Sequence, residues 1–402
     1  MRITDLKIKN IGAFSEAKLN FIDEDNPNKT PITLITGENG SGKTIILDAI
    51  RAMLWQNLTK LDRDIVRNKE NFEINMNVFV NGKSQEFVCN QHGVSTNIYF
   101  SKHFSAKIKD FRQITYDWIL NYWTSKTDNK ALKISKITNL DPNKYLVNVL
   151  SGIQPNIQVI ELITFFDYLK SSENRKEQKE GEFLMEKVKK IIQLSLFEGE
   201  FLYVERKSLT PLVKVGNKEL SLEKLSSGNL YLIQRLMALL GQMYAVYQIN
   251  SSNIEKMCDF QGVLLIDEAE NHLHPKWQKT FLKSILNIFP NLQIIATTHS
   301  PFIVASVENA KVFVCESRNN QVEIIDRSAE YSSKPVDEIL VSEIFGTQPF
   351  SFEITDLLEK RKKAIRQGNQ TERQILEDRL SKLNPEYFSY FGLEKKFPNL
   401  KF

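Results

Sequence analysis

The sequence predicts an α/β fold: a mixed sheet with helices, carrying a helical insert and a helical C-terminal extension. Two observations predict it. A short apolar run at residues 31–36 leads through a glycine-rich turn into helical spacing, which is typical of a buried strand followed by a helix. After a long interval of different character, predicted strands at 262–267 and 292–297 restore the alternation of strands and helices.

The composition is that of a globular protein with a large core. The 402 residues suffice for two to three domain-sized units, and 42% of them are hydrophobic and 25% charged. The net charge of +4 tolerates nucleic acid as a partner without indicating it. Cys89, Cys258 and Cys315 show no metal-type spacing, so we expect reduced thiols and a cytoplasmic location.

We expect no membrane partner. The N-terminus goes straight into an alternating strand pattern and lacks the apolar core of a signal peptide. The longest apolar region, 230–249, contains Gln234, Arg235 and Gln242 and therefore predicts a buried helix.

Residues 1–100 predict the N-terminal lobe of a head domain. Leu6 and Ile8 alternate with lysines, and residues 17–21 alternate in the same way after a turn at 10–12. Residues 44–57 then predict a helix, and residues 73–100 predict a hairpin that turns at Asn81-Gly82.

The rest of the chain falls into three parts. Residues 101–220 predict a mainly helical insert, whose mixed charges at 170–190 indicate a solvated helix or a loop. Residues 221–330 predict the C-terminal lobe of the head. Residues 331–402 predict a helical extension with an apolar stripe, which needs a cover; packing on the head and docking of a partner both remain open. The stripe comprises Ile354, Leu357, Leu358, Ile375, Leu376, Leu380 and Leu383.

A phosphate-binding loop is the most specific motif. Residues 37–44, GENGSGKT, fit the pattern GxxxxGK[ST] between a predicted strand and a predicted helix. Glycines let backbone amides wrap phosphates, Lys43 reaches the outer phosphates and Thr44 holds Mg²⁺. The motif predicts ATP and Mg²⁺ as cofactors. The nucleotide-binding residues are Gly37, Glu38, Asn39, Gly40, Ser41, Gly42, Lys43 and Thr44.

Two later strands end in residues suited to phosphoryl chemistry. The run 263–266 delivers Asp267 to the Mg²⁺ site and Glu268 to the attacking water, as its catalytic base. His299 follows the next apolar run and is expected to reach the γ-phosphate from the same face. A lone histidine would more often be a core residue, but the order of the motifs favours the catalytic role.

Residues 225–229, LSSGN, precede a predicted helix. Ser226, Ser227 and Gly228 offer hydroxyls and free amides, which make an anion site at a helix start. A plain helix cap would explain these residues taken alone, and the flanking motifs favour the nucleotide-binding interpretation.

These motifs, in this order, resemble the soluble SMC/RecF-like branch of the ABC ATPase superfamily. The resemblance also includes the opening residues 6–14 and the extension 267–275, and it covers about 1–100 and 221–315. It implies a homodimer in which LSSGN of one chain closes on ATP bound by the other, with residues 269–272 between the two sites. Ser227 and Asn229 depart from the usual glycine and glutamine of this signature. The family's Mg²⁺-sensing glutamine has three candidates: Gln85, Gln91 and Gln113.

Within that branch the chain looks like the ATPase component of Septu-type antiphage systems, including those attached to retrons. This resemblance implies a sensor or regulatory subunit acting with a separate HNH-type nuclease, because the chain shows no HNH pattern. DNA or retron RNA/DNA is an open partner. A RecF-like repair ATPase is the alternative, and a transporter ATPase fits the large insert poorly. His272 and His274 as metal ligands, and Glu205 with Lys207 as a nuclease motif, are minor alternatives.

Overall fold

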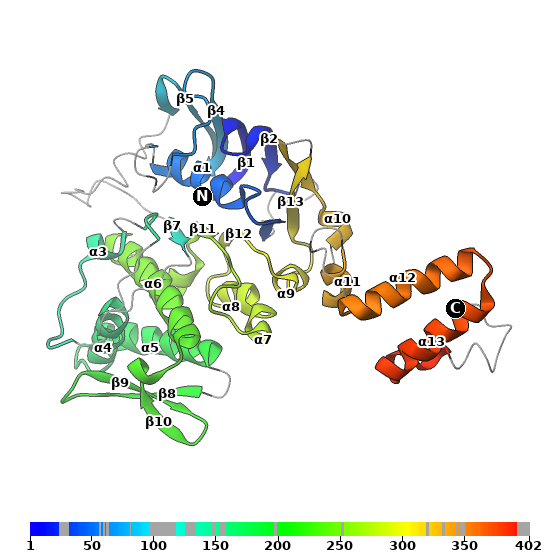
Figure 1. Cartoon of the computed structure of the whole chain (residues 1–402). Coiled ribbons are helices and arrows are strands. Elements are labelled where there is room, and N and C mark those ends of the chain that lie inside the picture. Colours follow the sequence, from blue (N-terminus) through cyan, green and yellow to red (C-terminus); the bar gives the residue numbers. More distant parts are fainter. Residues whose placement is uncertain are drawn as a thin grey trace. The chain divides into compact units, whose positions relative to one another are not determined.

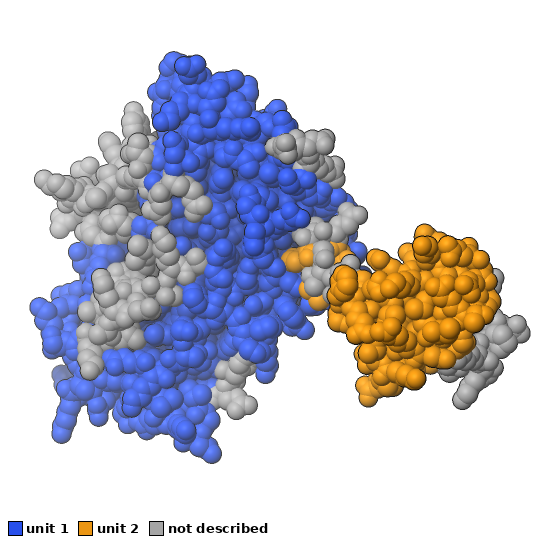
Figure 2. Space-filling model, in the orientation of Figure 1, with its two compact units in different colours: residues 1–339 blue, residues 340–402 orange. Residues whose placement is uncertain are grey.

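The computed structural model describes two compact units, Met1–Ile339 and Leu340–Phe402 (Figure 2). The described residues are 1–23, 32–55, 58, 61, 64–80, 82–96, 118–124, 134–146, 149–152, 157–196, 199–250, 253–318, 321–331, 334–342, 345 and 350–391.

The N-terminal strands form a five-stranded antiparallel sheet in the order β2-β1-β4-β5-β6 (Figure 1). Leu6, Ile8 and Leu19 are buried, whereas the lysines between them are exposed, so the predicted alternation is confirmed. Gly12 lies at the turn between the first two strands with a φ of 53°. The strands are β1 (Arg2–Ile11), β2 (Phe14–Asn20), β4 (Glu73–Val80), β5 (Lys83–Asn90) and β6 (Gly93–Thr96).

The central sheet has six strands in the order β14-β13-β3-β12-β11-β7. All neighbours are parallel except the β13–β14 pair. The carboxyl ends of β3, β11 and β12 therefore meet at one edge of the sheet, where ligands of open α/β sheets bind. The strands are β3 (Thr33–Gly37), β7 (Trp118–Trp123), β11 (Gln261–Ile266), β12 (Leu292–Thr297), β13 (Lys311–Arg318) and β14 (Gln321–Asp326).

The part predicted as a helical insert contains strands as well as helices. Strand β7 joins the central sheet beside β11, and β8 to β10 form a separate three-stranded antiparallel sheet. The charged stretch is a solvated helix, α5, with one buried face that includes Leu184 and Val188. These elements are α3 (Pro142–Leu146), α4 (Ile157–Lys170), α5 (Arg175–Ser195), β8 (Gly199–Glu205), β9 (Thr210–Val215) and β10 (Lys218–Ser221).

Two helices of the head begin at the sequence motifs of the predicted site. Helix α1 (Lys43–Trp55) follows the phosphate loop directly, and α6 (Ser227–Asn250) begins inside the LSSGN motif. Helix α6 is buried along most of its length, as its apolar sequence predicts, and it packs against α3, α4 and α5. Shorter elements complete the unit: α7 (Pro275–Gln278), α8 (Phe281–Ile288), α9 (Pro301–Ala305), α10 (Ser328–Tyr331), α11 (Val336–Leu340), and the 3₁₀ turns Leu222–Lys224 and Ile254–Asp259.

The C-terminal unit is a pair of helices with its own core. Helices α12 (Phe352–Arg366) and α13 (Gln370–Leu383) and the 3₁₀ turn Tyr387–Ser389 pack together. The core consists of Leu357, Ala364, Leu376, Leu380, Phe388 and Phe391. Much of the predicted apolar stripe is thus covered inside the unit, while Ile375 and Leu383 stay exposed.

Across the described residues, no helix combines the length and hydropathy that crossing a bilayer requires. Cys89, Cys258 and Cys315 are buried free thiols.

Candidate nucleotide site

The phosphate loop lies between β3 and α1 in a conformation that requires glycine. Gly40 and Gly42 have φ values of 81° and 88°. A Cβ at Gly37 would lie 2.4 Å from the carbonyl oxygen of Cys315, and a Cβ at Gly42 would lie 2.8 Å from the ring of Phe14. Around Gly40 there is open space within 4 Å. The loop is therefore packed against the head on one side and open on the side where phosphates would bind.

Lys43 closes the loop in this structure. Its Nζ donates hydrogen bonds to the carbonyl oxygens of Gly37, at 3.0 Å, and Glu38, at 2.7 Å. Burial lowers the pKa of Lys43, and the surrounding negative groups, among them Glu270 and Asp267, act in the opposite direction. The ammonium group is thus held against the loop, where an incoming phosphate would replace carbonyl oxygens as its partner.

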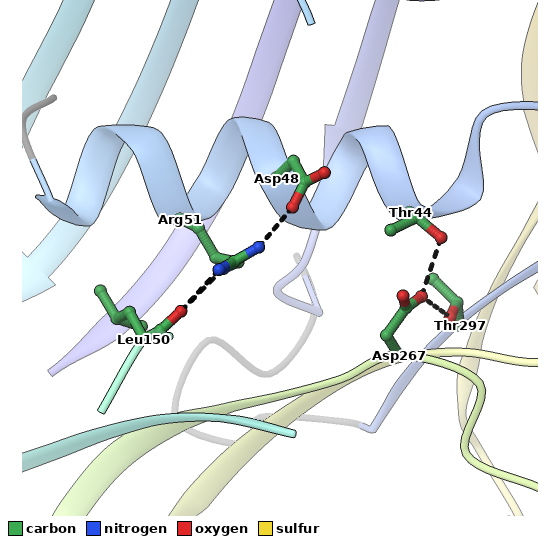
Figure 3. Close-up of polar contacts among 6 residues, drawn as sticks. All are labelled: Thr44, Asp48, Arg51, Leu150, Asp267 and Thr297. Carbon is green, nitrogen blue, oxygen red and sulfur yellow. Dashed lines mark hydrogen bonds and ion pairs between the residues drawn. The ribbon is translucent and has the colours of Figure 1, made fainter. Parts of the chain in front are cut away.

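Asp267 joins the phosphate loop to the far end of β12. Its Oδ1 accepts hydrogen bonds from Thr44 Oγ1, at 3.0 Å, and Thr297 Oγ1, at 2.7 Å (Figure 3). A carboxylate and a hydroxyl that already touch are a suitable beginning for a Mg²⁺ site, because Mg²⁺ prefers oxygen ligands and is bound by one or two carboxylates plus phosphates. The residues present therefore fit the Mg²⁺ that the motif implies.

Glu268 has a strained backbone and an oriented side chain. Its φ of 53° is uncommon for a residue other than glycine. The Glu268 amide donates to Thr297 Oγ1 at 2.8 Å, and Asn271 Nδ2 donates to the Glu268 carboxylate. Sequence reasoning assigned neither supporting residue this role, although Thr297 lies two positions before His299.

His299 is positioned by a second carboxylate. Its backbone amide donates to Glu270 Oε1 at 2.7 Å, and Thr298 Oγ1 donates to Glu270 Oε2 at 2.6 Å. Burial lowers the pKa of His299, and the nearby positive charge of Lys43 lowers it further. The imidazole is therefore neutral at pH 7 and carries one N–H donor.

The three motifs surround one cavity of about 240 Å³. It brings together Lys43, Thr44, Glu268 and His299, which lie far apart in the sequence. The full lining is Asn39, Gly40, Gly42, Lys43, Thr44, Ile45, Glu268, Thr297 and His299. The Lys43 ammonium group and the loop amides suit a polyphosphate, and the Glu268 carboxylate suits a water molecule beside it.

The LSSGN motif is not part of that lining. Ser226 and Ser227 are exposed at the start of α6, and Ser226 Oγ accepts a hydrogen bond from the Asn229 amide at 3.3 Å. A Cβ at Gly228 would lie 2.3 Å from the His272 carbonyl oxygen. Within one chain the motif is therefore packed beside the 269–272 loop, and its serines face outward.

The candidates for the Mg²⁺-sensing glutamine, for a histidine metal site and for a nuclease motif are not among the residues that line this cavity. Gln91 lines a different cavity of about 570 Å³, Gln85 lies on β5, and Gln113 falls outside the described residues. Among the described residues, His, Cys, Asp and Glu form no cluster of three able to hold a metal, and His274 instead caps α7. Glu205 ends β8 and accepts a hydrogen bond from Ser208.

Comparison with known proteins now defines the class. Residues 32–305 match the family described as "AAA domain, putative AbiEii toxin, Type IV TA system", and the chain belongs to this family. The chain therefore contains an ATPase domain. Its fold is the α/β head that the sequence predicts.

Individual relatives indicate a narrower group of proteins than the family does. The chain is 27% identical to Septu protein PtuA of Bacillus thuringiensis over 343 residues, which are 79% of this chain and 80% of that protein. It is 26% identical to a Septu protein PtuA of Bacillus mycoides (strain KBAB4) over 94% of this chain, but spans only 50% of that relative. It is also 28% identical to the Retron Vc95 probable ATPase of Vibrio cholerae serotype O1 biovar El Tor, over 50% of this chain and 40% of that protein.

Among solved structures, the SmcHead bound to the C-winged helix domain of ScpA aligns with a TM-score of 0.49 and 15% identity. The alignment covers 82% of this chain and 99% of that one.

Proposed function

We propose that this chain is the ATP-hydrolysing subunit of a bacterial antiphage defence complex, and that two copies build its sites together. One observation carries the proposal: the cavity contains the phosphate loop, Glu268 and His299, whereas the exposed serines of LSSGN are not among its lining residues. An anion-binding helix start that faces outward suits the γ-phosphate of ATP held by a second copy.

Each residue then has a distinct role. Lys43 and the loop amides bind the phosphates, and Thr44 and Asp267 would hold Mg²⁺, which neutralises phosphate charge when bound. Glu268, oriented by Asn271, takes a proton from the attacking water. His299, whose lowered pKa favours the neutral imidazole, donates a hydrogen bond to the γ-phosphate. Ser226, Ser227 and Gly228 of the partner copy complete the site.

The cellular role rests on the relatives. Two are named Septu protein PtuA and one a retron probable ATPase. We propose that this chain acts in a system of that kind in the cytoplasm, as the sensor or regulatory subunit beside a separate HNH-type nuclease. DNA or retron RNA/DNA is its proposed trigger. The C-terminal unit, which leaves Phe352 and Ile375 exposed, is the proposed docking surface for the nuclease.

Mixing two defective variants tests the composite site. Lys43→Ala inactivates the phosphate loop but keeps the signature, and Ser226→Arg blocks the signature but keeps the phosphate loop. Each homodimer should be inactive, while the heterodimer contains one complete site. We expect up to about half of wild-type ATPase activity in a fully heterodimeric sample if the sites act independently.

Ser208→Arg provides the matched control, since Ser208 is also an exposed serine but lies in the β8–β9 hairpin. It should be fully active alone. A Ser226→Arg homodimer with wild-type activity would rule out the composite architecture.

A further inference from the structure

Two buried arginines from different helices converge on one short segment, residues 149–152. Arg51 lies on α1, the helix that follows the phosphate loop, and Arg235 lies on α6, the helix that begins in the signature. Each side chain is 3% exposed. Burying a guanidinium group costs free energy unless its N–H donors are hydrogen-bonded, so the head requires the contacts of both arginines.

Arg51 holds the carbonyl of Leu150 with two donors. Its Nε and Nη2 lie 2.9 and 2.7 Å from that oxygen, and its Nη1 lies 2.6 Å from Asp48 Oδ1 (Figure 3). The guanidinium carbon also lies 3.9 Å from the centre of the Tyr122 ring, a cation–π contact.

Arg235 holds two other carbonyls at the same place. Its Nη1 donates to Gly152 at 2.9 Å, and its Nη2 donates to Thr124 at 2.8 Å. Gly152 has a φ of 81°, and a Cβ there would lie 2.9 Å from the side chains of Thr124 and Tyr122. The segment is therefore packed closely against the end of β7.

The end of β7 leads to the catalytic strand. The Tyr122 amide donates to the Val149 carbonyl at 3.1 Å, and the Asp267 amide donates to the Trp123 carbonyl at 2.8 Å. Residues 149–152 and 122–124, which we call the junction, thus contact α1, α6 and the residue proposed to hold Mg²⁺.

We propose that Arg51 and Arg235 are positioning residues that couple the phosphate loop to the signature helix through this junction. Thr44 and Arg51 are about two helical turns apart on α1, as are Ser227 and Arg235 on α6, so each helix transmits a displacement at its start to the junction. The coupling rests on the proposed composite site: ATP bound by one loop sets the position of the same chain's signature, and the reverse.

Conservative variants separate positioning from folding. Arg235→Lys and Arg51→Lys keep the positive charge but lose the planar fork that holds these carbonyls. We expect ATP affinity within about threefold of wild type, and kcat reduced by roughly tenfold to a hundredfold through misplaced catalytic groups. Arg361→Lys is the matched control, because Arg361 also pairs with a buried carboxylate, that of Glu377, and packs over a ring, that of Phe391, but lies in the C-terminal unit. It should keep wild-type kcat. Arginine variants that only lower the unfolding temperature, with kcat unchanged in the folded protein, would overturn the proposal.

The heterodimer with a single site gives a sharper test. Its complete site uses the phosphate loop of the Ser226→Arg chain and the signature of the Lys43→Ala chain. Arg235→Lys is placed in either chain. Loss of activity from both placements is the expected result, because the junction acts on the loop of its own chain as well as on the signature. Loss only from the signature-donating chain would mean that Arg235 merely supports α6, and would reject the coupling. An inactive reference heterodimer is the result that strict coupling gives, because the Lys43→Ala chain binds no ATP to position its own signature; the Ser226→Arg homodimer then decides on the composite site, which full activity of that homodimer would reject.

Discussion

The ATPase unit, residues 1–339, and the C-terminal unit, residues 340–402, differ in the sequence separation of the contacts that stabilise each of them. In the ATPase unit, the hydrogen bond from Thr44 to Asp267 joins residues 223 positions apart, and those between Ile3 and Gln293 join residues 290 apart. In the C-terminal unit, Glu377 pairs with Arg361 and Arg373, which lie 16 and 4 positions away. The proposed nucleotide site therefore depends on contacts between distant parts of residues 1–339, whereas the C-terminal helices are organised locally.

Removing the charge of Lys43 should have the largest effect on this long-range site. Lys43→Ala deletes the ammonium group that is proposed to bind the outer phosphates. Hydrogen bonds to charged groups contribute about 1.5–3 kcal/mol each. If Lys43 donates two such bonds to the phosphates, their loss lowers ATP affinity by about a hundredfold or more. Calorimetry with ATP measures it directly. Unchanged affinity would contradict the assignment of the phosphate loop, and Lys83→Ala, at an exposed lysine of β5, is the control.

Glu268→Gln should separate binding from hydrolysis. The amide keeps the shape of the side chain but cannot take a proton from water, so kcat should fall by about 10²–10⁴-fold with ATP binding retained. An ATP-stabilised dimer should accumulate, as size-exclusion chromatography with ATP would detect. Hydrolysis at the wild-type rate would assign the base elsewhere. Glu270→Gln is an informative comparison, because Glu270 positions the His299 backbone and does not line the cavity.

The same contrast explains what could be predicted from the sequence. The phosphate loop and the strand ending in Asp267 are contiguous motifs whose residue types are required by phosphate chemistry, so their local structures were predictable. The roles of Thr297, Asn271 and Gln293 depend on strands far apart in the sequence that meet in the sheet, and no local pattern indicates such a meeting. Strand β7 escapes prediction for a different reason: WILNYW is a short apolar run, which periodicity cannot distinguish from a buried helix.

Gln293 tests the long-range contacts without touching the nucleotide cavity. Its buried amide accepts from the Ile3 N–H at 2.7 Å and donates to the Ile3 carbonyl at 2.8 Å, linking β12 to the N-terminal sheet. Gln293→Leu leaves both backbone groups without this partner, which costs about 1–3 kcal/mol. We expect a lower unfolding temperature of the ATPase unit, measured by calorimetry, with little change in kcat at 25 °C.

The matched variant in the other unit is Glu377→Gln. It weakens local ion pairs with Arg361 and Arg373, and should loosen only the C-terminal helices. If this variant lowered the unfolding temperature of the ATPase unit as much as Gln293→Leu does, the two units would not be independently stable.

Deleting residues 340–402 should have the smallest effect on catalysis and the largest on partner binding. The deleted unit has its own core, and none of its described residues lines the nucleotide cavity, so ATPase activity should stay within about twofold of wild type. The proposed partner nuclease, co-expressed with the truncated chain, should no longer co-purify with it. Phe352→Glu, at a side chain that is 90% exposed, tests the same surface without truncation, and Tyr168→Glu, at an exposed tyrosine of α4, is its control. If the nuclease still binds the truncated protein, or if the truncation unfolds the ATPase unit, the C-terminal unit is not the docking surface and its helices serve the head instead.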